Sequence, residues 1–151
     1  MGCRDWFEQV RADVLEVAEM KDRAEVLRAA CGPKAATYGG GSHDPSRLSS
    51  EDVLIDAEME LDLRRQSLRA ELDRACAVLY GRDGRGGLAR MRGSAAADSI
   101  HGYYLQGMSW PEVAAELVRP ESRDGAHWCR MAATRALSYM DQVGMEYLAD
   151  L

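Results

Sequence analysis

The stretch that decides the fold reads YYLQGMSWPEVAAEL and runs from Tyr103 to Leu117. A helix is expected to end near Gly107, where a left-handed residue is favoured. Ser109 can cap the next helix, because Glu112 follows three residues later and Pro111 suits a first turn. The stretch therefore predicts two helices joined by a tight turn. The buried stripe of the second helix is expected to comprise Val113, Ala114 and Leu117.

A third, longer helix is predicted after Pro120, which breaks the chain, with Asp124 as its cap. Apolar residues recur along it at helical spacing, namely Cys129, Ala132, Ala133, Ala136, Leu137 and Met140. The other side carries His127, Trp128, Met131, Thr134, Arg135 and Ser138, with Arg130 near the boundary. Residues 94–151 are therefore expected to form a helix-turn-helix unit.

Two long helices are predicted ahead of this unit, over residues 5–30 and from Ser49 or Ser50 to Tyr80. The loop between them, residues 31–50, contains three consecutive glycines and two prolines. One heptad position of the second helix is apolar throughout: Leu54, Leu61, Leu68 and Ala75. A single stripe needs a partner helix, which is either the first helix in an antiparallel hairpin or a second copy of the chain. Residues 1–80 are thus predicted to be a helical hairpin or coiled coil, and the fold class is all-α.

Residues 81–93 are predicted to be a flexible, basic Gly/Arg linker, with four arginines against Asp83, a net charge of +3. Residues 94–151 hold four arginines and eight acids, a net charge of −4, and the whole chain carries −6. This acidic balance counts against a strongly electrostatic nucleic-acid binder. Because Phe7 is the only phenylalanine, the core is expected to be aliphatic.

The sequence lacks the residue patterns that several classes of function require. The four cysteines are far apart and form no CxxC pair, so no zinc site or other metal site is predicted. Ser42, His43 and Asp44 are adjacent and cannot adopt triad geometry, and we expect no enzyme and no cofactor. No apolar run is long enough to span a membrane, and the start does not resemble a signal peptide. We therefore expect reduced thiols in a cytoplasmic protein.

The motif over Tyr103–Leu117, followed by Arg130-x4-Arg135-Ala136-Leu137, resembles region 4 of sigma-70 factors. It is most similar to phage and prophage regulators of that class, the ArpU- and RinA-like late-gene transcription regulators. These share a Tyr-rich helix, a G-x-S-W-x-E-V-A turn and an R-A-L ending to the recognition helix. They also tend to begin with a predicted helical hairpin whose loop resembles Gly41-Ser42-His43-Asp44-Pro45 here. The chain departs from the family around residues 118–125, where the turn before the recognition helix is longer.

The resemblance implies a DNA-binding transcription regulator whose third helix enters the major groove. It places His127, Trp128, Arg130 and Met131 near base edges, with Thr134 further along. Arg123 and Arg135 then suit phosphates. Arginines 82, 85, 90 and 92 of the linker offer further phosphate contacts. The expected partners are double-stranded DNA, RNA polymerase and a second copy bound through the N-terminal helices, with no membrane.

Two alternatives remain open at this point. Small-terminase-like packaging proteins also join a helix-turn-helix to oligomerising helices. The acidic balance of residues 94–151 instead favours a protein–protein module that docks on RNA polymerase without binding DNA.

Overall fold

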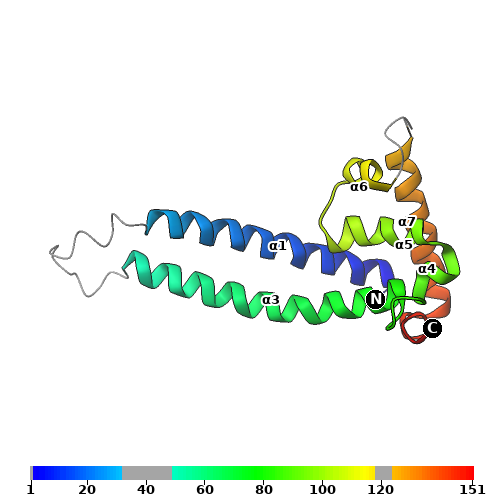
Figure 1. The fold of residues 1–151 in the computed structure, drawn as a ribbon, viewed down its shortest axis with the longest axis horizontal. Helices are drawn as coiled ribbons and strands as arrows, with labels where there is room; N and C mark the ends of the chain where they lie inside the picture. The colour runs from blue at the N-terminus through cyan, green and yellow to red at the C-terminus, as the bar shows by residue number, and fades with distance from the viewer. Residues whose placement is uncertain (1, 32–48, 118–123) are drawn as a thin grey trace. The chain divides into compact units, whose positions relative to one another are not determined.

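The computed structural model describes residues 2–31, 49–117 and 124–151 of the 151-residue chain. All regular structure in these ranges is helical, without a strand, as predicted. The elements in chain order are α1 (Cys3–Ala30), α3 (Ser50–Tyr80), α4 (Gly87–Arg92), α5 (Ser94–Ile100), a π-helix η1 (His101–Leu105), α6 (Trp110–Leu117), α7 (Gly125–Val143) and α8 (Met145–Asp150) (Figure 1). None of these helices combines the length and apolar character that crossing a membrane requires.

The chain divides into two compact units, one made of Met1–Val14 with Leu68–Leu151 and the other of Leu15–Ser67. The N-terminal end of α1 and the C-terminal end of α3 thus belong to the same unit as α4 to α8. The sequence instead predicted that residues 1–80 form one helical unit.

In the unit Leu15–Ser67, α1 and α3 lie side by side and run antiparallel (Figure 1). Exposed ion pairs join Arg28 to Glu58 and Glu16 to Arg64. Because the later residue of α1 pairs with the earlier residue of α3, the two helices are antiparallel. Such surface pairs contribute about 0–1 kcal/mol each, and the apolar seam contributes more. Of the two arrangements that the heptads allowed, the hairpin within one chain is therefore the one observed.

Local sequence explains where these helices start and stop. The backbone N–H of Asp52 donates to Oγ of Ser49 at 3.1 Å, which confirms a serine cap at the start of α3. In the other unit, the N–H of Cys3 donates to Oδ1 of Asp141 at 2.8 Å and caps α1 from α7. That bond lowers the pKa of the Asp141 carboxyl. Burial, with Asp141 adding to it, raises the pKa of the Cys3 thiol to about 12.

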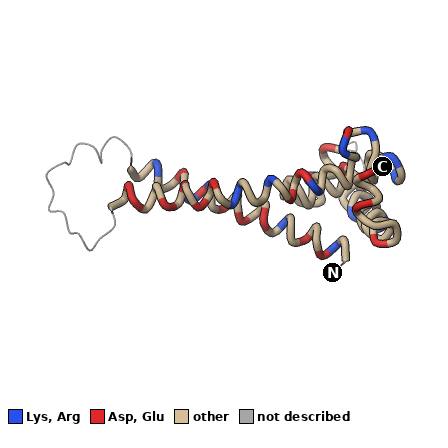
Figure 2. Tube along the Cα trace, turned by 90° about the horizontal axis from the view of Figure 1, so that it is seen from below, with Lys and Arg blue, Asp and Glu red and all other residues tan. Residues whose placement is uncertain are grey.

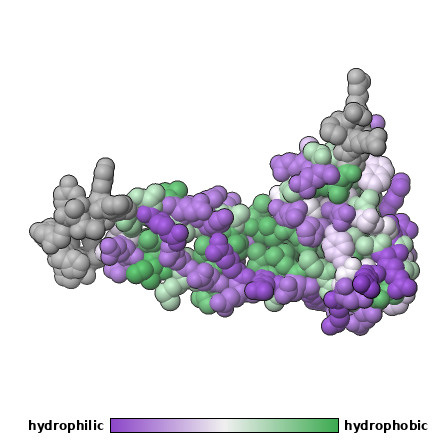
Figure 3. All heavy atoms as spheres, viewed as in Figure 1, coloured by the Kyte–Doolittle hydropathy of each residue, from purple (hydrophilic) through white to green (hydrophobic). Residues whose placement is uncertain are grey.

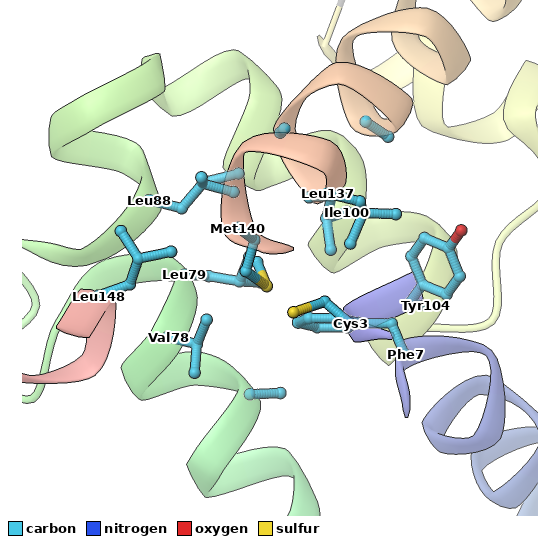
Figure 4. Close-up of a cluster of buried hydrophobic side chains, with 14 of the residues drawn as sticks. Cys3, Phe7, Val78, Leu79, Leu88, Ile100, Tyr104, Leu137, Met140 and Leu148 are labelled. Carbon is cyan, nitrogen blue, oxygen red and sulfur yellow. The ribbon is translucent and has the colours of Figure 1, made fainter. Parts of the chain in front are cut away.

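The core of the larger unit lies where α1, α3, α5, α7 and α8 converge (Figure 4). It is mostly aliphatic, as expected, but Phe7 is fully buried at its centre. The Phe7 ring meets Tyr104 edge-on at 5.8 Å and Trp6 at 4.9 Å. The expectation of a purely aliphatic core is therefore corrected, because a single phenylalanine recruits tyrosine and tryptophan rings from its neighbours.

The segment after α3 differs from the flexible linker that the sequence predicted. Residues Gly87–Arg92 form helix α4, and Leu88 is fully buried. Gly87 has φ +67, and a Cβ built there would lie 2.5 Å from the backbone nitrogen of Gly81. A Cβ at Gly86 would lie 2.6 Å from the carbonyl carbon of Leu151. These glycines permit close backbone approach, so they make a packed turn instead of a loose one.

Candidate nucleic-acid interface

The helix-turn-helix region turns at Gly107, which has φ +72 and so takes the predicted left-handed conformation. The N–H of Met108 donates to the carbonyl of Gly102 at 3.1 Å and closes the end of η1. The N–H of Glu112 donates to Oγ of Ser109 at 3.4 Å, so the predicted cap of α6 is present, although long. The turn and the start of α6 were therefore readable from the sequence.

Helix α6 packs against η1 through one close contact. A Cβ at Gly102 would lie 3.1 Å from Cγ2 of Val113, which is buried. Ala114 is partly buried, and Leu117 is 38% exposed, although we expected it in the buried stripe. Leu117 lies in the last turn of α6, one turn beyond the point where Val113 meets η1. The buried stripe is thus shorter than the sequence suggested.

A stack of three side chains supports the turn. The Arg11 guanidinium lies 3.8 Å above the centre of the Tyr103 ring, which stacks on Trp110 at 4.1 Å and 5°. Arg11 Nη1 also donates to the carbonyl oxygens of Tyr103 and, at 3.0 Å, Met108. These bonds satisfy carbonyls at the end of η1. Helix α1 therefore fixes the direction in which α6 leaves the turn, a long-range contact that sequence spacing does not reveal.

Helix α7 has the two faces that its sequence predicted. Its buried side chains include Cys129, Ala133, Ala136, Leu137 and Met140, while Ala132 is partly buried. Asp124 occupies the N-cap position, but its side chain makes no capping hydrogen bond. The exposed residues include His127, Trp128, Arg130, Met131, Arg135 and Ser138, followed by Asp141 and Gln142 near the end of the helix. The face that would meet a ligand is therefore free of the core.

Four of the predicted site residues share one hollow of about 390 Å³ in this unit. They are His127, Trp128, Met131 and Arg135, and Arg92, Ala96, Asp124 and Ala132 complete the lining. Trp128 is 50% exposed and Met131 is 36% exposed. Trp128 thus lies at the surface, on the side of α7 where the sequence placed it.

The other predicted residues lie outside this hollow. Arg130 is exposed on α7 but is not part of the lining. Thr134 is half-buried and its hydroxyl donates to the carbonyl of Arg130 at 2.9 Å, so it is engaged with its own helix. Arg123 lies outside the described residues. The hollow instead gains Arg92, which reaches α7 from α4 and lies 5.4 Å from the Tyr139 ring centre.

Several arginines around this surface form no ion pair with the described residues. Within the described ranges, no ion pair involves Arg90, Arg92, Arg130 or Arg135. On other surfaces Arg4, Arg28, Arg64, Arg74 and Arg82 form ion pairs, whereas Arg23, Arg65 and Arg85 form none within the described ranges. Helices α4 and α7 therefore offer guanidinium groups that are free to bind an anion.

Many acids of residues 94–151 are engaged away from the exposed face of α7. Asp98 accepts from the Tyr80 hydroxyl, Asp141 from the Cys3 N–H, Glu146 pairs with Arg74 and Asp150 with Arg82. Asp124 lines the hollow itself. Glu112 and Glu116 remain exposed on α6, so only part of the negative charge that counts against DNA binding is engaged by other groups.

A half-buried polar cluster lies where the end of α3 meets α5 and η1. The Tyr80 hydroxyl donates to Oδ1 of Asp98 at 2.6 Å, and its ring meets His101 at 5.9 Å. Burial raises the pKa of Tyr80, and the bond to Asp98 adds to this effect. Burial also lowers the pKa of His101. These contacts pack the end of α3 against α5 and η1.

The described residues were also compared with the ligand sets of metal sites. Within residues 2–31, 49–117 and 124–151, no group of three His, Cys, Asp or Glu side chains is placed to hold an ion. All four cysteines are unpaired.

No protein-family model matches the chain, and neither the curated proteins nor the solved structures contain a significant match to it.

Proposed function

We propose that this chain is a double-stranded-DNA-binding transcription regulator of the sigma-70 region 4-like type, encoded by a phage or prophage. The observation that carries the proposal is the exposed face of α7, where Trp128, Met131 and Arg135 line one hollow with Arg92 from α4, and where Arg130 is exposed outside that hollow.

The dimensions of α7 suit a groove-binding role. Its 19 residues make a helix about 28 Å long. Its buried face is occupied by the core, so only the outer face is available to bases. B-DNA's major groove, about 12 Å wide, admits one helix. The Gly107 turn and the Arg11–Tyr103–Trp110 stack supply the rigid support that such a helix needs.

Each exposed side chain has a role that fits its chemistry. Arg130 is free to pair with the O6 and N7 atoms of guanine, and Met131 or Trp128 to contact a thymine methyl group. Arg92 and Arg135, on two different helices, are placed to bind phosphates. The contacts to bases would determine sequence specificity. The contacts to phosphates would fix the orientation of the protein on the duplex and make the affinity depend on salt concentration.

We expect Arg130→Ala to weaken binding to a cognate duplex by roughly 10- to 100-fold, because a bidentate guanine contact contributes about 1–3 kcal/mol. Fluorescence anisotropy with fragments from upstream of the cognate operon measures this affinity. Arg28→Ala is the matched control, since it removes the same charge from an arginine paired with Glu58 in the other unit. Equal affinities for the two variants would remove α7 from the interface.

Exposed Trp128 and Met131 also favour a second candidate, docking on a protein such as RNA polymerase. Apolar side chains gathered at one surface are typical of protein contacts. This function predicts no duplex binding at any salt concentration, together with co-purification of polymerase that Trp128→Ala abolishes.

A further inference from the structure

The hollow beside α7 follows one stripe of that helix. Trp128, Met131 and Arg135 are three or four residues apart, so they lie on the same side of α7 over about 10 Å. Arg92 of α4 and Ala96 of α5 line the hollow from neighbouring helices. Its volume of about 390 Å³ equals that of roughly a dozen water molecules at about 30 Å³ each. The hollow therefore has room for one nucleotide rather than for a base pair.

The lining combines groups that recognise the two parts of a nucleotide. The half-exposed indole of Trp128 offers a flat ring, and Met131 and Ala132 offer apolar contacts. Arg92 and Arg135 form no ion pair within the described ranges, so their guanidinium groups can bind phosphates. Figure 3 shows purple polar residues interspersed with pale and green ones on the surface of this unit. A ligand that suits this lining carries both an aromatic ring and a negative charge.

The charge around the hollow favours an anion. The lining contains Arg92, Arg135 and His127 against a single acid, Asp124. In Figure 2, blue basic positions are present on the helices near the C-terminus, although residues 94–151 carry a net charge of −4. This local excess of cations favours a nucleic-acid strand over an uncharged apolar segment of a protein.

We infer that this hollow binds an unpaired nucleotide of single-stranded DNA, with its base stacked on Trp128 and the adjoining phosphates on Arg92 and Arg135. In a duplex, the faces of the bases are covered by their neighbours and proteins read base edges from the grooves. An indole in a hollow of this size stacks on a base only after that base has left the duplex. Stacking on an aromatic ring tolerates every base, so we expect little dependence on sequence. The choice of DNA over RNA rests on the proposed function, whereas the stacking on Trp128 goes beyond it.

The probe is oligodeoxythymidine of about ten nucleotides, which forms no duplex, added to the full chain. We expect a dissociation constant on the order of 1–100 µM and quenching of Trp128 fluorescence by the stacked base. Trp6 and Trp110 are partly buried against the core and supply the background signal. Trp128→Ala should raise the dissociation constant about 5- to 150-fold, the effect of losing one stacked base. Trp128→Phe should retain most of the affinity and lose the quenching, because phenylalanine also stacks.

Arg135 and Arg130 supply a matched pair of variants on the same helix. Arg135→Ala should weaken binding of the oligonucleotide about fivefold or more, since it removes a charged partner of a phosphate. Arg130→Ala should change that affinity less than about twofold, because Arg130 lies outside the hollow. Under the proposed function, Arg130→Ala weakens duplex binding, so the two proposals respond differently to this one variant.

Four results would overturn the inference: no binding of oligodeoxythymidine at low salt, no quenching of Trp128, equal binding of an abasic strand of the same length, or equal effects of Arg130→Ala and Arg135→Ala. Duplex binding without single-strand binding would reject this inference and leave the proposed function in place. Tighter binding of oligouridine would overturn the choice of DNA. A protein segment that binds the hollow while the oligonucleotide does not would also reject the inference.

Discussion

Replacement of Gly87 by alanine is expected to lower the free energy of unfolding by about 3–5 kcal/mol, the sum of left-handed strain and overpacking. Gly87 has φ +67, and the new Cβ would lie 2.5 Å from the nitrogen of Gly81 and 2.7 Å from that of Tyr80. Both are backbone atoms, which cannot rotate away as a side chain can. Urea denaturation followed by circular dichroism measures the loss.

Gly84→Ala is the matched control for this prediction. Gly84 has φ +78 but no atom within 4 Å of its Cβ position, so the change should cost only the strain of about 1–2 kcal/mol. The difference between the two variants isolates the close approach of the chain at Gly87. Equal losses would mean that residues 81–87 form the loose linker that their composition suggests.

Replacement of Phe7 by alanine is expected to cost about 3–5 kcal/mol, the usual range for a buried aromatic side chain. Phe7 is fully buried, and its ring contacts both Tyr104 and Trp6. Its loss leaves a cavity between α1 and η1, which the surrounding helices can fill only in part. Thermal and urea denaturation of the purified variant test this.

Leu15→Ala, further along α1, serves as the control. Leu15 is 41% exposed, and we expect its truncation to cost less than about 1 kcal/mol because little buried surface is lost. If Phe7→Ala were no more harmful than Leu15→Ala, the aromatic cluster would not hold α1 in the larger unit.

The sequence predicted what depends on local patterns. The left-handed turn at Gly107, the cap at Ser109 and the two faces of α7 all follow from short-range signals, and the structure has each of them. The hairpin was one of two arrangements that the heptads of α3 allowed. Such features need only spacing and residue type, which is why a single sequence reveals them.

The features that the sequence missed depend on contacts between distant segments. Glycine content alone indicates flexibility, but the steric room at Gly87 depends on where Gly81 lies. The contacts of Arg11 with Tyr103 and of Arg92 with α7 likewise join residues whose proximity only the fold determines. For the candidate site, the pattern therefore identified the exposed face of α7 and named Arg92 as a phosphate contact, but it did not show that Arg92 lies beside α7.

The central claim is that the exposed face of α7 binds duplex DNA, and the salt dependence of binding tests it most directly. We predict that log K falls linearly with log salt concentration, with a slope of about −0.9 for each phosphate contacted. The triple variant Arg92→Ala, Arg130→Ala, Arg135→Ala should flatten that slope by about 2, since Arg92 and Arg135 are the phosphate contacts, whereas Arg4→Ala, Arg28→Ala, Arg64→Ala should not. Both triple variants change the net charge equally, but the second removes arginines that form ion pairs. Equal slopes for the two variants, or no duplex binding by the unaltered chain at low salt, would contradict the account.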